Sequence, residues 1–436
     1  MAHPVTPRTQ AWLGHAQRVA LWILVPVMAA LTLFDLRRDV NGNHGVLSLE
    51  LLLYTVIVVV TLPVIWVRRR HVLPASRRVL GSFGTVWACA LVSSLTTTRP
   101  LLQKVVVERR YLVTPVIEAG LVPVAAFGIV LSMAPKDRRR ALWMAAVTIV
   151  ALTPFAWWRG VANGEIIRLS SALGGAAVVH VPLLLCAGIF ADHAVRGSRV
   201  VLNATLAVAA VVMALLSGSR AGLICVALFT LLVLRWGTSG RARRLTSRVA
   251  VATGLALGLL VVVVPSLRRL VAFSDELRLT NLTTAMDSLG GSPSTVFFGL
   301  GWGRLWPWFA FETGRLQMPW RGEGPTEFGT ALTNPHSIFL GVLVELGALA
   351  LIPVVLMFVF LVLAVARRAR RGDSPGLLVC LAVIATLPAF LFDLYLFKNF
   401  ATSFWWWLVL AAFLATGPAG DERSSVADPG AAALPE

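Results

Sequence analysis

An all-α protein that crosses a membrane many times is predicted by three features of the sequence. Of the 436 residues, 57% are hydrophobic and only 14% are charged, and the mean hydropathy is +0.78. Apolar runs of about 17–25 residues, long enough to cross a bilayer as helices, recur along the chain. The basic residues are divided among the short connections between these runs. We therefore expect a polytopic membrane protein.

About twelve segments are expected to cross the membrane. The first is not a cleavable signal peptide, because no small-residue cleavage site follows it. Residues 417–436 are rich in Pro, Gly and Ala and are expected to form a disordered tail. Residues 1–416 then form one transmembrane domain, with expected spans at 17–35, 46–67, 79–96, 112–133, 141–158, 172–191, 200–216, 219–236, 249–265, 336–365, 376–396 and 400–416.

The basic residues predict how these spans are oriented. Short connections after even-numbered spans carry Arg68, Arg69, Arg70, Arg77 and Arg78, then Lys136, Arg138, Arg139 and Arg140, then Arg196 and Arg199, then Arg241, Arg243, Arg244 and Arg248, and last Arg367, Arg368, Arg370 and Arg371. By the positive-inside rule, these connections and both termini face the cytoplasm. Segment 97–111 is an exception, because its basic residues fall on the outer side. It either lies on the membrane surface or meets an anionic ligand.

Two other classes of protein do not fit this pattern. The net charge of +18 invites a nucleic-acid partner, but the basic residues form no single basic face, so no nucleic acid is expected. The four cysteines lie inside apolar runs without CxxC spacing. They predict neither a disulfide framework nor a metal site, and no cofactor is expected.

The longest hydrophilic connection, residues 266–334, is expected on the outer face between the ninth and tenth spans. It is too long, and too rich in Trp, Phe and Gly, to be a simple linker. A serine followed by two acids at 274–276 predicts the start of a helix.

Glycine and tryptophan mark the second half of this connection. Glycines at 299, 301 and 303 predict a turn in which the backbone packs closely, since no strand–helix unit surrounds them as a phosphate-binding loop would require. Tryptophans at 302, 306, 308 and 320 predict interfacial anchors, with binding of sugar rings as the alternative.

Arg220 is predicted at the outer start of the eighth span, after a connection of only a few residues. A helix start offers free N–H groups and a partial positive charge, and an arginine beside it favours a diphosphate or similar anion. Ser219, which precedes Arg220, is a candidate supporting residue. The alternative is an interfacial arginine that reaches lipid headgroups.

His336 and Glu345 place ionisable groups in and before the long tenth span. Such groups are costly at membrane depth, so each is a functional candidate. The nine positions between them turn an ideal helix by roughly 180°, so the two are not expected to form one acid–base pair. Glu345 is expected to be a buried structural carboxylate. The alternative for His336 is an interfacial histidine satisfied by backbone.

Arg278 lies in the long outer connection and alone would pass for a solvated charge. The predicted topology, however, brings Arg220, Arg278 and His336 to the same membrane face although they are far apart in sequence. This common location makes all three residues candidates for one functional site.

These motifs together resemble the O-antigen ligase and polymerase superfamily. The resemblance covers roughly residues 160–365 and rests on Ser217-Gly-Ser-Arg220-Ala, on Arg278 upstream of Gly299-x-Gly301, and on Asn334-Pro-His336-x-x-x-Leu340 with Glu345-Leu-Gly347. In the family an asparagine directly precedes the histidine, whereas here Pro335 stands between Asn334 and His336. Asn334 is therefore a candidate supporting residue only.

The resemblance implies a metal-independent, GT-C-like membrane glycosyltransferase with its site on the periplasmic face of the bacterial inner membrane. Its donor would be a glycan linked to undecaprenyl diphosphate, with membrane lipids around it. Arg220 and Arg278 would match the family's essential arginines and His336 its histidine. Arginines can stabilise a leaving diphosphate in place of a metal, and histidine suits the removal of an acceptor proton.

Members of this superfamily differ mainly in their acceptor. Twelve spans, one long outer loop and no soluble C-terminal domain favour the ligase, which transfers a finished glycan to lipid A–core in lipopolysaccharide biosynthesis. An O-antigen polymerase or a protein O-oligosaccharyltransferase is the alternative. Two rivals from other classes are a metal-dependent transferase using Asp35 and Asp39, and a transporter of lipid-linked glycans, for which no internal repeat is visible.

Overall fold

The structure is a computed structural model that describes residues 22–36, 48–68, 72, 74–97, 109–162, 168–237, 276–306, 335–370 and 376–414. Within these ranges every regular element is a helix. The predicted all-α class is therefore confirmed.

Among the described residues, six helices are long and apolar enough to cross a membrane by length and composition. They are α2 (Leu49–Arg68), α3 (Pro74–Thr96), α4 (Arg109–Ser132), α5 (Pro135–Ala162), α9 (Arg220–Leu232) with its π-helical continuation η2 (Val233–Gly237), and α14 (Ile338–Arg370). These helices indicate a membrane protein.

Shorter apolar helices coincide with other expected spans. They are Trp22–Leu33, α7 (His180–Val195), α8 (Val200–Leu216), α15 (Leu377–Ala385) with the 3-10 helix η4 (Leu387–Leu391), and α16 (Phe400–Leu414). The expected span 249–265 and the tail 417–436 lie outside the described residues. The total of twelve spans, like the orientation, stays a prediction.

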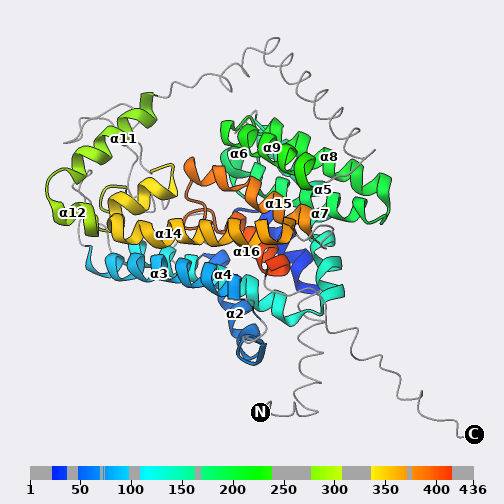
Figure 1. Cartoon of the computed structure of the whole chain (residues 1–436), viewed down its shortest axis with the longest axis horizontal. Coiled ribbons are helices and arrows are strands. Elements are labelled where there is room, and N and C mark those ends of the chain that lie inside the picture. Colours follow the sequence, from blue (N-terminus) through cyan, green and yellow to red (C-terminus); the bar gives the residue numbers. More distant parts are fainter. Residues whose placement is uncertain are drawn as a thin grey trace, which may run out of the picture.

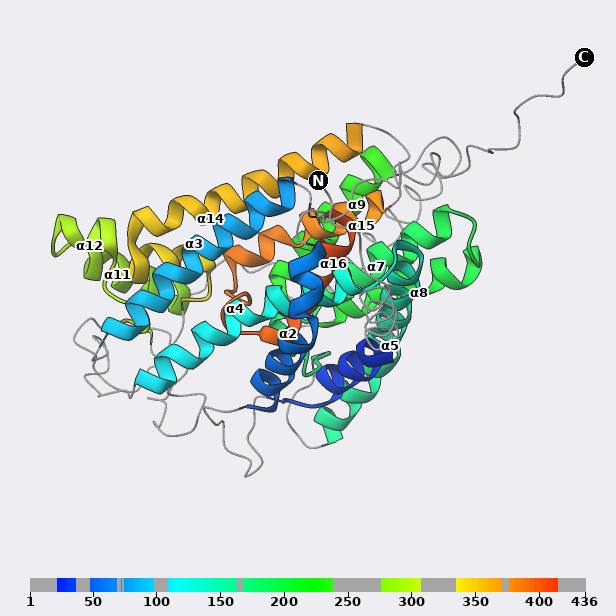
Figure 2. The same cartoon turned by 90° about the horizontal axis from the view of Figure 1, so that it is seen from below.

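Helix α16 forms the centre of the molecule. Every side chain described in it is buried, as expected of a helix that is hydrophobic all round. Its aromatic residues meet those of surrounding elements: Phe404 lies 5.3 Å from Tyr54 of α2 and Trp407 lies 5.1 Å from Phe83 of α3, measured between ring centroids. Figure 2 shows α16 enclosed by the other helices.

Two groups of helices flank this centre. On one side α14 packs along α3, and α4 packs against α2 and α16 (Figures 1 and 2). On the other side α7 packs against α5, α8 and α15, while α9 contacts α15 and η4. Two shorter helices of the long connection, α11 (Glu276–Leu289) and α12 (Pro293–Phe298), lie beside the first part of α14.

The expected tenth span is not one continuous helix. It begins at Ile338 and is interrupted at Gly347, where φ is 83° and ψ is 172°, a conformation that only glycine adopts readily. The segments on either side of Gly347 point in different directions (Figure 1). Because glycine is also common within spans, the sequence alone gave no sign of this break.

The expected eleventh span is shorter than predicted. Its α-helix ends at Ala385 instead of residue 396, and η4 follows with Pro388 in its first turn. Proline lacks an N–H group and disfavours a helical residue before it, which explains this end. The residues after η4 have no helix, yet Leu394–Phe397 are buried. Such backbone at membrane depth is tolerated where protein covers it.

Candidate functional site

Arg220 is the first residue of α9, as the sequence predicted. Ser219 is the N-cap: its Oγ accepts the Gly222 N–H at 3.3 Å and donates to the Ala177 carbonyl at 3.2 Å. The second bond ties the start of α9 to α6 (Gly175–Val178), far away in the sequence. The half-buried Arg220 is thereby held at a fixed helix N-terminus, the kind of position that favours anions.

His180 lies directly behind this helix start and was not predicted from the sequence. It is 1% exposed, and a Cβ atom added to Gly222 would lie 3.1 Å from its Cβ and Cγ atoms. Among the described residues, neither of its ring nitrogens has a hydrogen-bond partner of normal geometry. An ionisable side chain inside an apolar run was the signal that could have drawn attention to it.

Arg278, in the first turn of α11, is exposed and lies over the ring of Phe392. The distance from the guanidinium carbon to the ring centroid is 5.6 Å, within the range of a cation–π contact. Phe392 follows η4 directly. The contact therefore connects the long connection to the buried turn between α15 and α16.

His336 has an unusual backbone conformation just before α14. Its φ is 50°, one of two positive values among the described non-glycine residues. Such a conformation costs on the order of 1 kcal/mol and persists where surrounding contacts hold it, often at functional sites. Ser337 follows, and its Oγ accepts the Leu340 N–H at 3.4 Å, which caps the new helix. Asn334 lies outside the described residues.

Asn281 connects the helix of Arg278 to the backbone of the His336 segment. Its Nδ2 donates to the Pro335 carbonyl at 3.5 Å, and its Oδ1 accepts the indole N–H of Trp306 at 2.9 Å. Asn281 is one helical turn from Arg278, so the two share a face of α11. The helix that contains Arg278 is thus tied to the residue directly before His336.

Glu345 belongs to the same network. Its carboxylate is 2% exposed and its Oε1 accepts the backbone N–H of Trp306 at 3.1 Å. A chain of bonds therefore runs from Glu345 through Trp306 and Asn281 to Pro335, next to His336. The carboxylate itself supports the protein backbone in this arrangement.

The break at Gly347 exists because the glycine-rich turn packs into it. A Cβ atom on Gly347 would lie 2.1 Å from the Phe297 carbonyl oxygen, and one on Gly299 would lie 2.4 Å from the Glu345 carbonyl carbon. The backbone N–H groups of Leu300 and Gly301 bond the carbonyls of Val344 and Glu345 at 2.9 and 3.0 Å. The interrupted helix end needs such partners. The predicted close packing of this turn is confirmed.

Trp302 and Trp306 are not interfacial anchors. Each is 1% exposed, and both lie in the protein interior, so the sequence-based prediction is wrong for them. Trp302 packs against Phe397, with ring centroids 5.3 Å apart. The glycine-rich turn carries these rings inward, where they cannot stack on a sugar. Trp308 and Trp320 lie outside the described residues.

The 3-10 helix η4 is the element on which these parts meet. It contacts α9, which begins with Arg220, and also α14, which follows His336, while α11 contacts α14. The ring of Phe392, at the end of η4, makes the cation–π contact with Arg278. The elements that contain or adjoin three basic residues, far apart in the sequence, are thereby connected through one turn. Such a set can bind an anion and supply one titratable imidazole.

No group of three or more His, Cys, Asp or Glu residues suited to a metal ion occurs in the part of the chain that the structure describes. Of the two acids proposed for a metal-dependent transferase, Asp35 is described and Asp39 is not. Segment 98–108, with most of the basic outer connection, also lies outside the described residues, and α4 begins at Arg109.

Comparison with protein-family models gives no match, and comparison with curated protein sequences gives none either.

Proposed function

We propose that this protein is a membrane glycosyltransferase of the O-antigen ligase type. It transfers a glycan as one block from undecaprenyl diphosphate to lipid A–core at the periplasmic face of the inner membrane. The observation that supports the proposal is that η4 contacts α9, which begins with Arg220, and α14, which follows His336, while Arg278 lies over Phe392 at the end of η4. The order and spacing of the motifs that contain them supply the resemblance to this superfamily.

In the proposed reaction an acceptor hydroxyl oxygen attacks the anomeric carbon of the donor sugar. The bond from that carbon to the diphosphate oxygen breaks, and the lipid diphosphate leaves with the electron pair. His336 takes the hydroxyl proton, which requires a neutral imidazole. Arg220 and Arg278 neutralise the charge of the diphosphate, a role for which the planar guanidinium with its several donors is suited.

The helix start at Arg220 supports this assignment. Ser219 accepts the N–H of Gly222, and the helix dipole favours a phosphate group at this end. Arg278 lies on α11, and Asn281, one turn further along the same helix, donates a hydrogen bond to the Pro335 carbonyl. Binding of the diphosphate at Arg278 would therefore also fix the backbone that carries His336.

The test is glycan transfer by the purified protein in detergent. Lipid-linked glycan is mixed with lipid A–core, and the product is followed by gel mobility and mass. The proposal predicts a ligated product that forms equally well in EDTA. Product on a second lipid-linked repeat or on a protein would instead identify a polymerase or a protein O-oligosaccharyltransferase. Donor movement across a vesicle membrane without any transfer would identify a transporter.

A further inference from the structure

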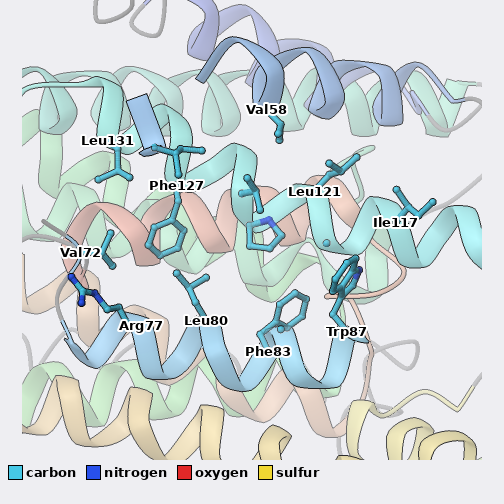
Figure 3. Close-up of a pocket in the computed structure, with 15 residues that line it drawn as sticks. Val58, Val72, Arg77, Leu80, Phe83, Trp87, Ile117, Leu121, Phe127 and Leu131 are labelled. Atoms are coloured by element: carbon cyan, nitrogen blue, oxygen red, sulfur yellow. The ribbon is translucent and has the colours of Figure 1, made fainter. Parts of the chain in front are cut away.

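A cavity that no residue of η4 lines lies between α2, α3 and α4. Its volume is about 820 Å³, within the roughly 300–1,000 Å³ typical of ligand sites. Figure 3 shows apolar side chains pointing into it from all three helices. They include Val58 of α2, Leu80 and Phe83 of α3, and Leu121, Phe127 and Leu131 of α4.

This cavity is an elongated groove, and its two ends differ in charge. Among the residues that line it, Arg77 is the one charged side chain, and Figure 3 shows it at the same end as Val72 and Leu131. Arg68 reaches this end too, because its guanidinium donates to the Leu131 carbonyl at 2.5 Å. Trp87 occupies the other end, where its indole N–H donates to the Val116 carbonyl at 2.7 Å.

The length of the groove matches one leaflet of a bilayer. Arg77 and Trp87 are ten positions apart on α3, which corresponds to roughly 15 Å along a helix. Half of a hydrocarbon core is also about 15 Å thick. The groove lies among three span-length helices, and Ile117 and Val124 leave its mouth apolar and exposed.

We propose that this groove binds an anionic phospholipid, with an acyl chain along α3 and α4 and the phosphate at Arg77. Basic residues between transmembrane helices are a known means of recognising anionic headgroups. A long isoprenoid diphosphate fits less well, because its anion would enter from the side of the glycine-rich turn. This turn meets α3 at Ser93 and Thr97, beyond Trp87, and no charged residue lines that end of the cavity. The site is independent of the proposed glycan transfer.

The helix α3 offers a matched pair of variants for the test. A Cβ atom added to Gly84 or to Gly81 would meet nothing within 4 Å, so a larger side chain fits at both positions. Gly84 lines the groove, whereas Gly81 does not. Gly84→Leu therefore fills the groove, and Gly81→Leu makes the same change in the same helix outside it. Equal thermal unfolding of the two variants shows that both are folded.

The measurement is native mass spectrometry of the full-length protein in detergent, titrated with phosphatidylglycerol or with phosphatidylcholine of identical chains. We expect the wild type and Gly81→Leu to retain phosphatidylglycerol preferentially and Gly84→Leu to lose it. Arg77→Ala should reduce the preference roughly fivefold, the factor for about 1 kcal/mol per basic residue near an anionic lipid. This variant tests the headgroup without filling the groove.

Three results would overturn the proposal. Binding of as much phosphatidylglycerol by Gly84→Leu as by Gly81→Leu would show that the groove is not the lipid site. An unchanged preference of Arg77→Ala for phosphatidylglycerol over phosphatidylcholine would show that the anionic headgroup is not bound at the Arg77 end of the groove. Displacement of phosphatidylglycerol by undecaprenyl phosphate from the wild type, in a manner abolished by Gly84→Leu, would assign the groove to the isoprenoid instead.

Discussion

Two regions of the molecule differ in how their backbone hydrogen-bonding groups are satisfied. One consists of the helices α2, α3 and α4, and the other of the elements around η4. The first three are continuous helices long enough to cross a membrane. Most of their backbone groups are therefore satisfied within each helix, apart from the carbonyls that lose a donor at Pro63 of α2 and at Pro115 and Pro123 of α4. Around η4, by contrast, α14 is broken at Gly347, His336 has a left-handed backbone, and the chain after η4 is buried without a helix. Each irregularity needs a specific partner from a distant segment.

This difference indicates in which region a catalytic site is to be expected. A regular helix presents side chains to lipid, as in the groove of Figure 3, but leaves no backbone group for a ligand. The irregular region exposes a helix start at Arg220 and brings three segments of the chain to one turn. Strained and interrupted backbone is retained where surrounding contacts and function require it.

The largest effect is expected from His336→Ala. If His336 is the general base of the irregular region, transfer should fall by roughly 10²–10⁴-fold while donor binding stays intact. Initial rates and binding of the glycan linked to undecaprenyl diphosphate measure the two quantities. His193→Ala, in the last turn of α7, is the control. Because a base acts as neutral imidazole, wild-type activity should fall toward acid pH; a fall toward alkaline pH would indicate a cationic anchor instead.

Arg220→Ala should lower transfer by roughly 10–100-fold, since hydrogen bonds to charged groups contribute about 1.5–3 kcal/mol. Arg220→Lys should recover little, because lysine keeps the charge but lacks the planar fork that grips two oxygens. The same rates measure both. Arg235→Ala, in η2 at the opposite end of this span, should leave transfer unchanged. Full recovery by lysine would reduce Arg220 to a general electrostatic anchor.

The loss in the free energy of unfolding should distinguish a glycine that is needed for close packing from one that is needed only for its backbone conformation. Gly299 and Gly197 both have φ of 76°, but an added Cβ atom meets the Glu345 backbone at the first and nothing at the second. Gly197→Ala should cost on the order of 1 kcal/mol through strain. Gly299→Ala should cost about 1–3 kcal/mol more, through overpacking and through its ψ of 179°, which at this φ only glycine adopts readily. Unfolding in detergent compares them. Equal losses would mean that the fit between Gly299 and the break in α14 is loose.

A smaller effect is expected from Trp306→Phe, which removes the indole N–H bonded to Asn281. The loss should be about 0.5–1.5 kcal/mol, seen as a lower kcat with unchanged donor binding, because Asn281 positions the His336 segment. Trp302→Phe is the matched control: it is equally buried, and its indole N–H has no hydrogen-bond partner among the described residues. A change in Trp302→Phe as large as in Trp306→Phe would show that ring packing, not the hydrogen bond, matters.

Much of the local structure could be predicted from the sequence. The helix start at Arg220 with Ser219 as its cap follows from short-range rules, and the close packing at Gly299 and Gly301 follows from glycine spacing. The all-α class follows from hydropathy alone. These features depend on residues that are near one another in the chain.

The remaining features depend on contacts that span the chain. Nothing near Gly347 marks it as a break, because the cause is the Phe297 carbonyl that packs against it. The contact between Arg278 and Phe392, and the burial of Trp306 against Asn281, arise only when α11 meets the turn after η4 and the start of α14. Sequence periodicity carries no information about such pairs.

The proposed mechanism requires that Arg220 and Arg278 bind one diphosphate. A double-mutant cycle tests it most directly, with undecaprenyl diphosphate binding to the wild type, Arg220→Ala, Arg278→Ala and the double variant measured in detergent. Two arginines on one ligand should couple by about 0.5–3 kcal/mol, whereas Arg220→Ala combined with Arg235→Ala should be additive. Additivity of Arg220→Ala and Arg278→Ala within about 0.3–0.5 kcal/mol would contradict a common site.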